Sequence, residues 1–102
     1  MIDFCERGLK TMASNPGLTG GEIEEILICS MTPGRWYTRQ EAIELVEKSG
    51  KVTNADRRII GSGEMQFHRR TSNALRGLAR YNDILERNEI NPGFWQYRLP
   101  PE

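Results

Sequence analysis

Four residues between positions 69 and 80 have side chains suited to reading DNA: Arg69, Asn73, Arg76 and Arg80. On a helix that turns about 100° per residue, they fall within a stripe of roughly 60°. Arginine and asparagine have the donor and acceptor geometry that matches guanine edges, adenine edges and phosphate oxygens. One face of such a helix would present three guanidinium groups and an amide, which makes it a candidate DNA-reading surface.

The opposite side of the same segment is apolar. Leu75 and Leu78 would enter a core, and Thr71 and Ala79 flank them. His68 also falls beside this apolar stripe, so we interpret it as a packed imidazole rather than a catalytic or metal-binding one. The pattern predicts a helix that begins at residue 65 or 67 and ends at residue 81.

Charge is unevenly distributed along a chain whose net charge is zero, with 14 basic and 14 acidic residues. Zero net charge alone argues against a nucleic-acid binder. However, residues 22–47 carry six glutamates and two arginines, whereas residues 57–80 carry six arginines and one glutamate. This segregation gives the molecule one cationic side. The alternative is that both segments are solvated faces that attract each other within the fold or between copies.

The sequence offers no support for an enzyme. It has one histidine, and His68, Cys5 and Cys29 lack the spacing of metal ligands. Ser62 lies outside a Gly-x-Ser-x-Gly pattern, and the segment around it is too short to cradle a phosphate. We therefore expect no catalytic residue, no metal and no cofactor.

Length and composition are those of one soluble globular domain: 102 residues, 37% hydrophobic and 27% charged. No apolar run approaches the ~20 residues of a membrane helix, and the first residues do not resemble a secretory signal. We expect two reduced thiols, at Cys5 and Cys29, in a cytoplasmic protein with no membrane partner.

Two capped helices are expected in the first half of the chain. Residues 1–17 have weak periodicity and would form an N-terminal arm or short helix, followed by a domain over residues 18–102. Thr19 with Glu22, and Thr38 with Glu41, have the spacing of capping boxes. The first helix would end at Pro33-Gly34, and the second, about three turns long, at Gly50.

Strands are expected on either side of the third helix. Residues 35–37 would form a very short one, whereas residues 83–90 and 94–99 would form a β-hairpin around a turn at 91–93. Between the second and third helices, residues 51–63 are interpreted as an insertion that contains a short helix, because a structureless loop of this length is unusual in a compact domain.

This order of elements resembles the winged helix-turn-helix family over roughly residues 19–100. Residues 35–42 are similar to the family's first strand leading into its capped second helix, and residues 73–87 to a recognition helix running into the wing. The expected fold class is therefore α+β and mainly helical. It has three helices, a C-terminal hairpin wing and an insertion between helices two and three, where the family has a short turn. A second departure is that Glu86 and Glu89 flank Arg87 in the wing.

The resemblance implies that the third helix enters the major groove and the wing contacts the neighbouring backbone or minor groove. Asn73 would then read an adenine edge, and Thr38 or Arg39 would donate to a phosphate at a helix N-terminus. In this fold the first strand commonly pairs with the return strand of the wing, which would bring Trp36 near Trp95. Four arginines of the third helix would divide between phosphates and guanine edges, two more would contact DNA from the insertion, and one lies in the wing: Arg69, Arg70, Arg76, Arg80, Arg57, Arg58 and Arg87.

Two functions remain open from the sequence. The first is sequence-specific binding of double-stranded DNA by a small transcriptional regulator. It would act as a homodimer, with residues 1–17 as the expected dimer contact, because a single module of this size buries little surface on DNA. The second is a winged-helix protein–protein interaction module, an adaptor or an inhibitor of a nucleic-acid machine, which the acidic helices and zero net charge fit equally well.

Overall fold

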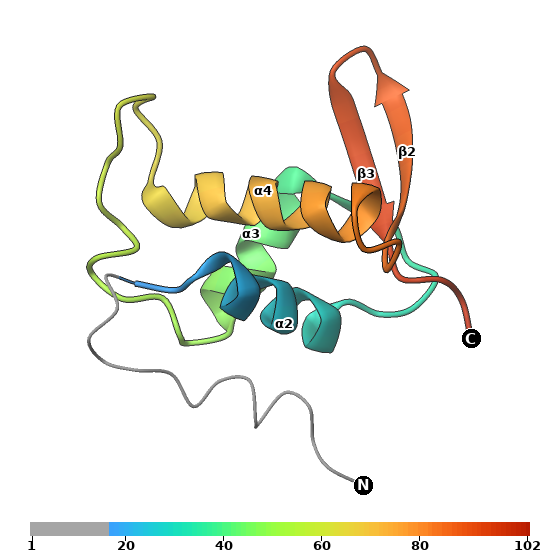
Figure 1. Ribbon diagram of the computed structural model, residues 1–102, viewed down its shortest axis with the longest axis horizontal. Helices are drawn as coiled ribbons and strands as arrows, with labels where there is room; N and C mark the ends of the chain where they lie inside the picture. The colour runs from blue at the N-terminus through green and yellow to red at the C-terminus, as the bar shows by residue number, and fades with distance from the viewer. Residues whose placement is uncertain (1–16) are drawn as a thin grey trace, which may run out of the picture.

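The computed structural model describes residues 17–102, and over this range the protein is a small α+β unit of three helices and one three-stranded antiparallel sheet (Figure 1). In chain order the elements are α2 (Gly20–Ser30), β1 (Tyr37–Thr38), α3 (Arg39–Lys48), α4 (Gln66–Arg80), β2 (Glu86–Asn91) and β3 (Phe94–Arg98). Residues 1–16, and with them nearly all of the expected N-terminal arm, lie outside the described residues.

Both predicted capping boxes are confirmed. The Glu22 carboxylate accepts the Thr19 N–H at 2.7 Å while Thr19 Oγ1 accepts the Glu22 N–H at 3.2 Å. In the same way Glu41 accepts from Thr38 N at 2.9 Å and Thr38 Oγ1 accepts from Glu41 N at 3.2 Å. Each box satisfies backbone donors that a helix N-terminus otherwise leaves unpaired, so these short local patterns fix where α2 and α3 begin.

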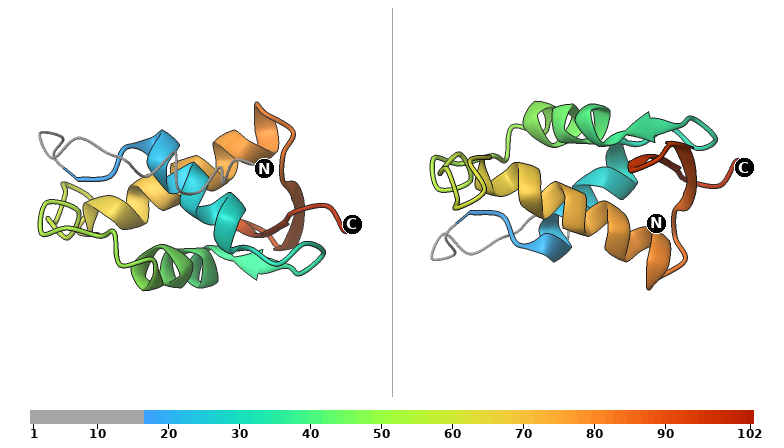
Figure 2. Two further views of the ribbon diagram at one scale, coloured as in Figure 1. Left: turned by 90° about the horizontal axis from the view of Figure 1, so that it is seen from below. Right: turned by 90° about the horizontal axis from the view of Figure 1, so that it is seen from above.

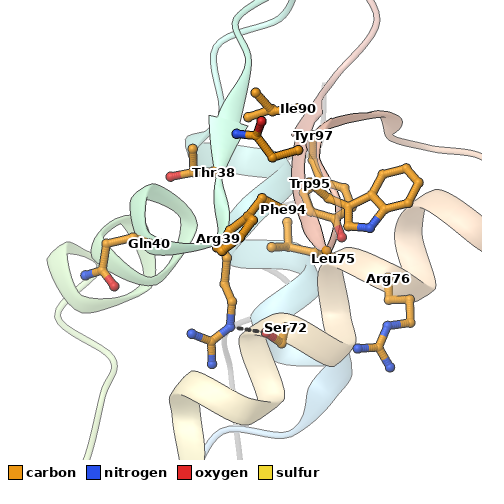
Figure 3. Close-up of a pocket in the computed structure, with 12 residues that line it drawn as sticks. Thr38, Arg39, Gln40, Ser72, Leu75, Arg76, Ile90, Phe94, Trp95 and Tyr97 are labelled. Carbon is orange, nitrogen blue, oxygen red and sulfur yellow. Dashed lines mark hydrogen bonds between the residues drawn. The ribbon is translucent and has the colours of Figure 1, made fainter.

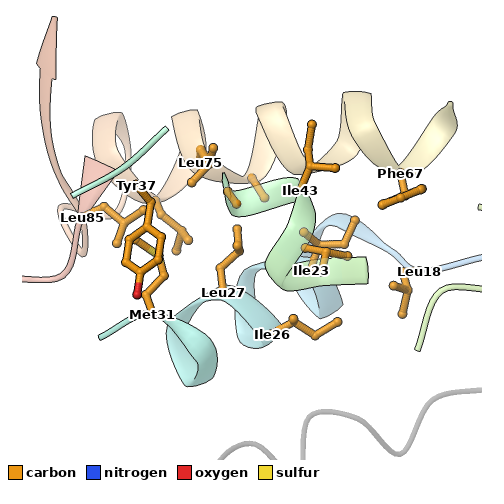
Figure 4. Close-up of a cluster of buried hydrophobic side chains, with 14 residues drawn as sticks. Leu18, Ile23, Ile26, Leu27, Met31, Tyr37, Ile43, Phe67, Leu75 and Leu85 are labelled. Atoms are coloured by element: carbon orange, nitrogen blue, oxygen red, sulfur yellow. The ribbon is translucent and has the colours of Figure 1, made fainter. Parts of the chain in front are cut away.

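The core lies where the three helices meet, with α4 crossing both α2 and α3 (Figure 2). Leu75 and Leu78 are buried as predicted, and Phe67 at the other end of α4 is fully buried with the half-buried His68 ring packed on its edge. The apolar faces of α2 and α3 supply most of the rest, and Leu18, Met31, Tyr37 and Leu85 complete it (Figure 4). The buried apolar side chains that α2 and α3 contribute are Ile23, Ile26, Leu27, Ala42, Ile43 and Val46.

The sheet has the order β1-β3-β2, so the first strand pairs with the return strand of the hairpin as predicted. Strand bounds differ from the expectation: β1 includes Thr38 but not residues 35 and 36, and β2 begins at Glu86 rather than at residue 83. The register places Tyr37 opposite Tyr97. In this register Trp36 and Trp95 are not cross-strand partners, since Trp95 pairs with Glu89. Each indole has an arginine over its ring: Arg98 lies 4.6 Å from the Trp36 centroid and Arg87 4.6 Å from that of Trp95.

The segment between α3 and α4 is not helical, which corrects the expectation for residues 51–63. It forms consecutive turns and one antiparallel bridge between Ile59 and Met65. Its organising residue is the fully buried Asp56, whose carboxylate accepts the Leu18 N–H at 2.7 Å and the Thr53 N–H at 2.8 Å. These bonds tie the insertion to the start of α2, at the end of α4 opposite the hairpin (Figure 1).

Two further findings concern the expected cellular setting. Cys29 is disulfide-bonded, so the expectation of a reduced thiol at this position is wrong. Cys5, the other cysteine of the sequence, lies outside the described residues. Within residues 17–102, no helix has the length and apolar character to cross a membrane. Disulfides are rare in a reducing cytosol, so the disulfide at Cys29 does not support the expected cytoplasmic location, which stays a prediction.

Candidate nucleic-acid interface

The four side chains of the predicted reading stripe are all exposed on α4. They point to solvent because the opposite face of the helix is committed to the core through Phe67, Thr71, Ala74, Leu75 and Leu78. Helical phase alone decides this, so the exposure of Arg69, Asn73, Arg76 and Arg80 could be predicted from the sequence.

Arg76 and Arg80 differ from the other arginines of the basic segment, because among residues 17–102 neither forms an ion pair or a side-chain hydrogen bond. Arg80 lies 6.0 Å from the ring centroid of the exposed Tyr81, at the outer limit of a cation–π contact. Together with Asn73 they cover the half of α4 nearer the hairpin. Two full positive charges are therefore available there to an anionic ligand.

Arg69 and Arg39 converge on the carboxylate of Glu64. Arg39 Nη2 lies 2.6 Å from Glu64 Oε1, and Arg69 Nε lies 2.8 Å from Glu64 Oε2. Burial alone would raise the pKa of Glu64, but hydrogen bonds from Ser62 and Arg69 and the charges of Arg69 and Arg39 outweigh it and hold the pKa below its usual value. Sequence reasoning missed this contact, although Glu64 is the one acidic residue between positions 57 and 80.

The remaining arginines of the basic segment have partners away from the α4 stripe. Arg70 is half-buried and donates from Nη1 to the Leu18 carbonyl at 2.6 Å. Arg57 forms an ion pair with Glu47, and its Nη1 lies 3.0 Å from Glu47 Oε1. Arg58 donates to Gln66 Oε1 at 2.7 Å. The structure thus places these three at the end of α4 remote from the hairpin rather than beside Arg76.

A hollow of about 570 Å³ separates the N-terminal end of α3, the middle of α4 and the hairpin (Figure 3). Its lining combines polar side chains, among them Arg39 and Arg76, with aromatic and aliphatic ones. Two of its residues, Gln40 and Ser72, carried no signal in the sequence; Ser72 Oγ accepts from Arg39 Nε. The full lining is Thr38, Arg39, Gln40, Ser72, Leu75, Arg76, Ile90, Asn91, Gly93, Phe94, Trp95 and Tyr97.

The hairpin contributes one arginine and an apolar tip. Arg87 lies over the Trp95 ring, 4.6 Å from its centroid, and is exposed. Glu89 accepts the Gly93 N–H at 3.0 Å and so closes the turn, while Glu86 pairs with Arg98. Phe94 is 69% exposed and Ile90 49% exposed. Both carboxylates of the hairpin strands therefore have partners within the hairpin, and the charge of Glu86 is paired with that of Arg98.

Among the described residues, no group of three or more histidine, cysteine or acidic side chains could hold a metal ion. No family model, curated protein or solved structure matches this chain. Function must therefore be inferred from the geometry of the interface itself.

Proposed function

We propose that the chain binds double-stranded DNA as a winged-helix protein, with α4 in the major groove, and that it acts as a small sequence-specific transcriptional regulator. The observation that carries this proposal is that Asn73, Arg76 and Arg80 are exposed on one face of α4, with no ion pair to either arginine among residues 17–102. Asparagine and arginine in this position match the adenine and guanine edges that the major groove displays.

The arrangement of the other elements supports the same proposal. The order of three helices and the β1-β3-β2 sheet is compatible with a winged helix, and the hairpin projects past the helices on the α4 side (Figure 1). Arg39 at the start of α3 lines the hollow, and Arg87 in the hairpin lies over Trp95, which also lines it; both arginines would contact backbone phosphates. In this proposal α4 reads sequence and the flanking elements fix its orientation.

A protein-interaction module is the second candidate, and the apolar tip of the hairpin is the observation that favours it. Phe94 and Ile90 are exposed and line the hollow together with Trp95 and Tyr97. A hollow lined by aromatic and aliphatic residues with a few polar groups is typical of sites that take an apolar side chain of a partner. An interaction of this type would depend on the apolar residues and only weakly on salt.

The experiment that separates the two is equilibrium binding to a random-sequence duplex at about 50 and 200 mM salt, where a protein that makes several phosphate contacts loses affinity steeply. Arg76→Ala and Arg80→Ala should each weaken binding by about tenfold, and a lost phosphate contact should also flatten the salt dependence. Arg57→Ala is the matched control, because it removes the same charge from an arginine already paired with Glu47.

Folded Arg76→Ala and Arg80→Ala proteins with the affinity of the unmodified chain would remove α4 from this role. Absence of measurable binding to any duplex, with the chain folded, would instead leave the protein-interaction module as the supported function.

A further inference from the structure

Two arginines from different elements hold one carboxylate on the α4 face. Arg39 is the first residue of α3 and Arg69 lies in the first turn of α4, and both guanidinium groups reach Glu64, at 2.6 and 2.8 Å. A carboxylate between two guanidinium groups has the charge and the acceptor oxygens of a phosphate in the same position. The cluster therefore has the form of an anion site with a protein group in it.

Neighbouring hydroxyl groups position the same cluster. Ser62 Oγ donates to Glu64 Oε2 at 3.0 Å, and Ser72 Oγ of α4 accepts from Arg39 Nε. The arginine side chains are 46% and 48% exposed, whereas that of Glu64 is 23% exposed. The guanidinium groups thus remain open to solvent, and an incoming anion can reach them without any opening of the core.

Displacement of Glu64 needs only side-chain rotation. Its backbone carbonyl accepts the Ile60 N–H at 2.9 Å, so the main chain is held in the turn. The adjoining Gly61 and Gly63 have no other residue within 4 Å of the position of a Cβ, so the space beside the turn is open. A carboxylate expelled from the arginine pair can therefore move into solvent while the loop stays in place.

The cluster lies on the proposed DNA-binding face. Arg69 shares the exposed stripe of α4 with Arg76, and Arg39 lines the same hollow as Arg76. We propose that Arg39 and Arg69 form a phosphate-binding pair that Glu64 occupies in the free protein, and that a backbone phosphate of DNA displaces the Glu64 carboxylate on binding. This inference rests on the proposed function and adds to it a built-in competitor that limits binding to duplex.

Glu64→Gln tests the competitor directly, because glutamine keeps the shape and an acceptor oxygen but lacks the charge. With a random-sequence duplex at about 50 mM salt, we expect this variant to bind about fivefold more tightly than the unmodified protein. Glu47→Gln is the matched control, since Glu47 pairs with Arg57 at the remote end and its loss should leave affinity unchanged. Circular dichroism checks that both variants are folded.

The role of the arginine pair is tested by a double-mutant cycle. Arg69→Ala should weaken duplex binding more in the Glu64→Gln background than in the unmodified chain, because only there is Arg69 fully available to phosphate. Equal losses in the two backgrounds, or a Glu64→Gln protein that binds no more tightly than Glu47→Gln, would overturn the proposal while leaving DNA binding by α4 intact.

Inorganic phosphate gives a readout that does not depend on DNA. In Glu64→Gln, titration with phosphate should shift the side-chain Nε–H resonances of Arg39 and Arg69 to saturation, and at lower phosphate than in the unmodified protein. Absence of these shifts would overturn the phosphate site. Saturable shifts in a chain that binds no duplex would support the phosphate site and contradict both the proposed function and the displacement by DNA.

Discussion

At the scale of single residues, Gly17 has the strictest requirement in the described chain. Its backbone has φ +90°, and a Cβ at this position would lie 2.3 Å from Asp56 Oδ1, the atom that accepts the Leu18 N–H. Gly17→Ala therefore strains the backbone and disrupts the buried carboxylate together, and we expect it to lower the free energy of unfolding by about 2 kcal/mol or more. Urea denaturation followed by circular dichroism measures this.

Gly20→Ala is the control for that substitution. Gly20 is the first residue of α2, and no other residue lies within 4 Å of the place that a methyl group would take, so alanine should be neutral or slightly stabilising there. Equal stability of the Gly17→Ala protein and the unmodified chain would show that the Asp56 contact does not fix the start of α2.

The candidate site was predictable at the residue scale only in part. Helical phase predicted which side chains of α4 are exposed, because that property depends on residues within a few turns. It could not predict which arginines have partners, since Glu64 meets Arg39 across 25 positions and Arg70 meets Leu18 across 52. Tertiary contacts of this kind leave no periodic signal in the sequence.

At the scale of elements, the starts of the helices depend on local sequence, whereas the insertion depends on tertiary contacts. The starts of α2 and α3 were predictable because a capping box is complete within four residues. The insertion was not, because the contact that ties it to the core, from the Leu18 N–H to the Asp56 carboxylate, spans 38 positions of the chain. Strands β1 and β2 began later than expected, since their bounds depend on pairing across the sheet, as between Tyr37 and Tyr97, whereas β3 begins at Phe94 as predicted.

Gly77 is the one glycine within α4. A Cβ there would meet Glu24 Oε2 of α2 at 3.3 Å, the mobile end of a flexible side chain. Because a glycine within a helix is less favourable than alanine by about 1 kcal/mol, Gly77→Ala should raise the free energy of unfolding by roughly 0.5–1 kcal/mol. Chemical denaturation of the single variant gives this value.

The Glu24→Ala background tests the explanation for Gly77. Removal of the carboxylate abolishes the close contact, so the gain from Gly77→Ala should be at least as large in that background. A loss of stability in both backgrounds would mean that α2 and α4 are packed too closely at this crossing for a methyl group.

At the scale of the whole molecule, four of the six arginines that the sequence assigns to one cationic side have partners within the fold. Of the six arginines in residues 57–80, Arg57 and Arg69 pair with glutamates, and Arg58 and Arg70 donate to Gln66 and Leu18. For Arg57 and Arg69, the structure therefore agrees with the alternative prediction, in which the basic and acidic side chains attract each other within the fold. Arg76 and Arg80, which have neither an ion pair nor a side-chain hydrogen bond among residues 17–102, lie in the half of α4 beside the hairpin, which gives a smaller contact surface than the sequence indicates.

Because this contact surface is small, we expect two copies of the chain to bind one DNA site. A single module of this kind buries about 600–1,000 Å² on DNA, which is little for tight specific binding. The molecule measures 41 × 36 × 23 Å, so two copies can lie side by side on successive major grooves, which are about 34 Å apart on one side of the duplex.

Selection of bound sequences from a random duplex pool should then yield inverted repeats with half-site centres about 10 base pairs apart, and sedimentation should give two chains per selected duplex. The same selection with Arg76→Ala should lose its preference within each half-site while keeping the spacing, since the arginine would read bases and the dimer would set the distance. A single uninterrupted site bound by one chain would contradict the dimer, and the length of that site would then have to be accounted for by α4 and the hairpin of one copy alone.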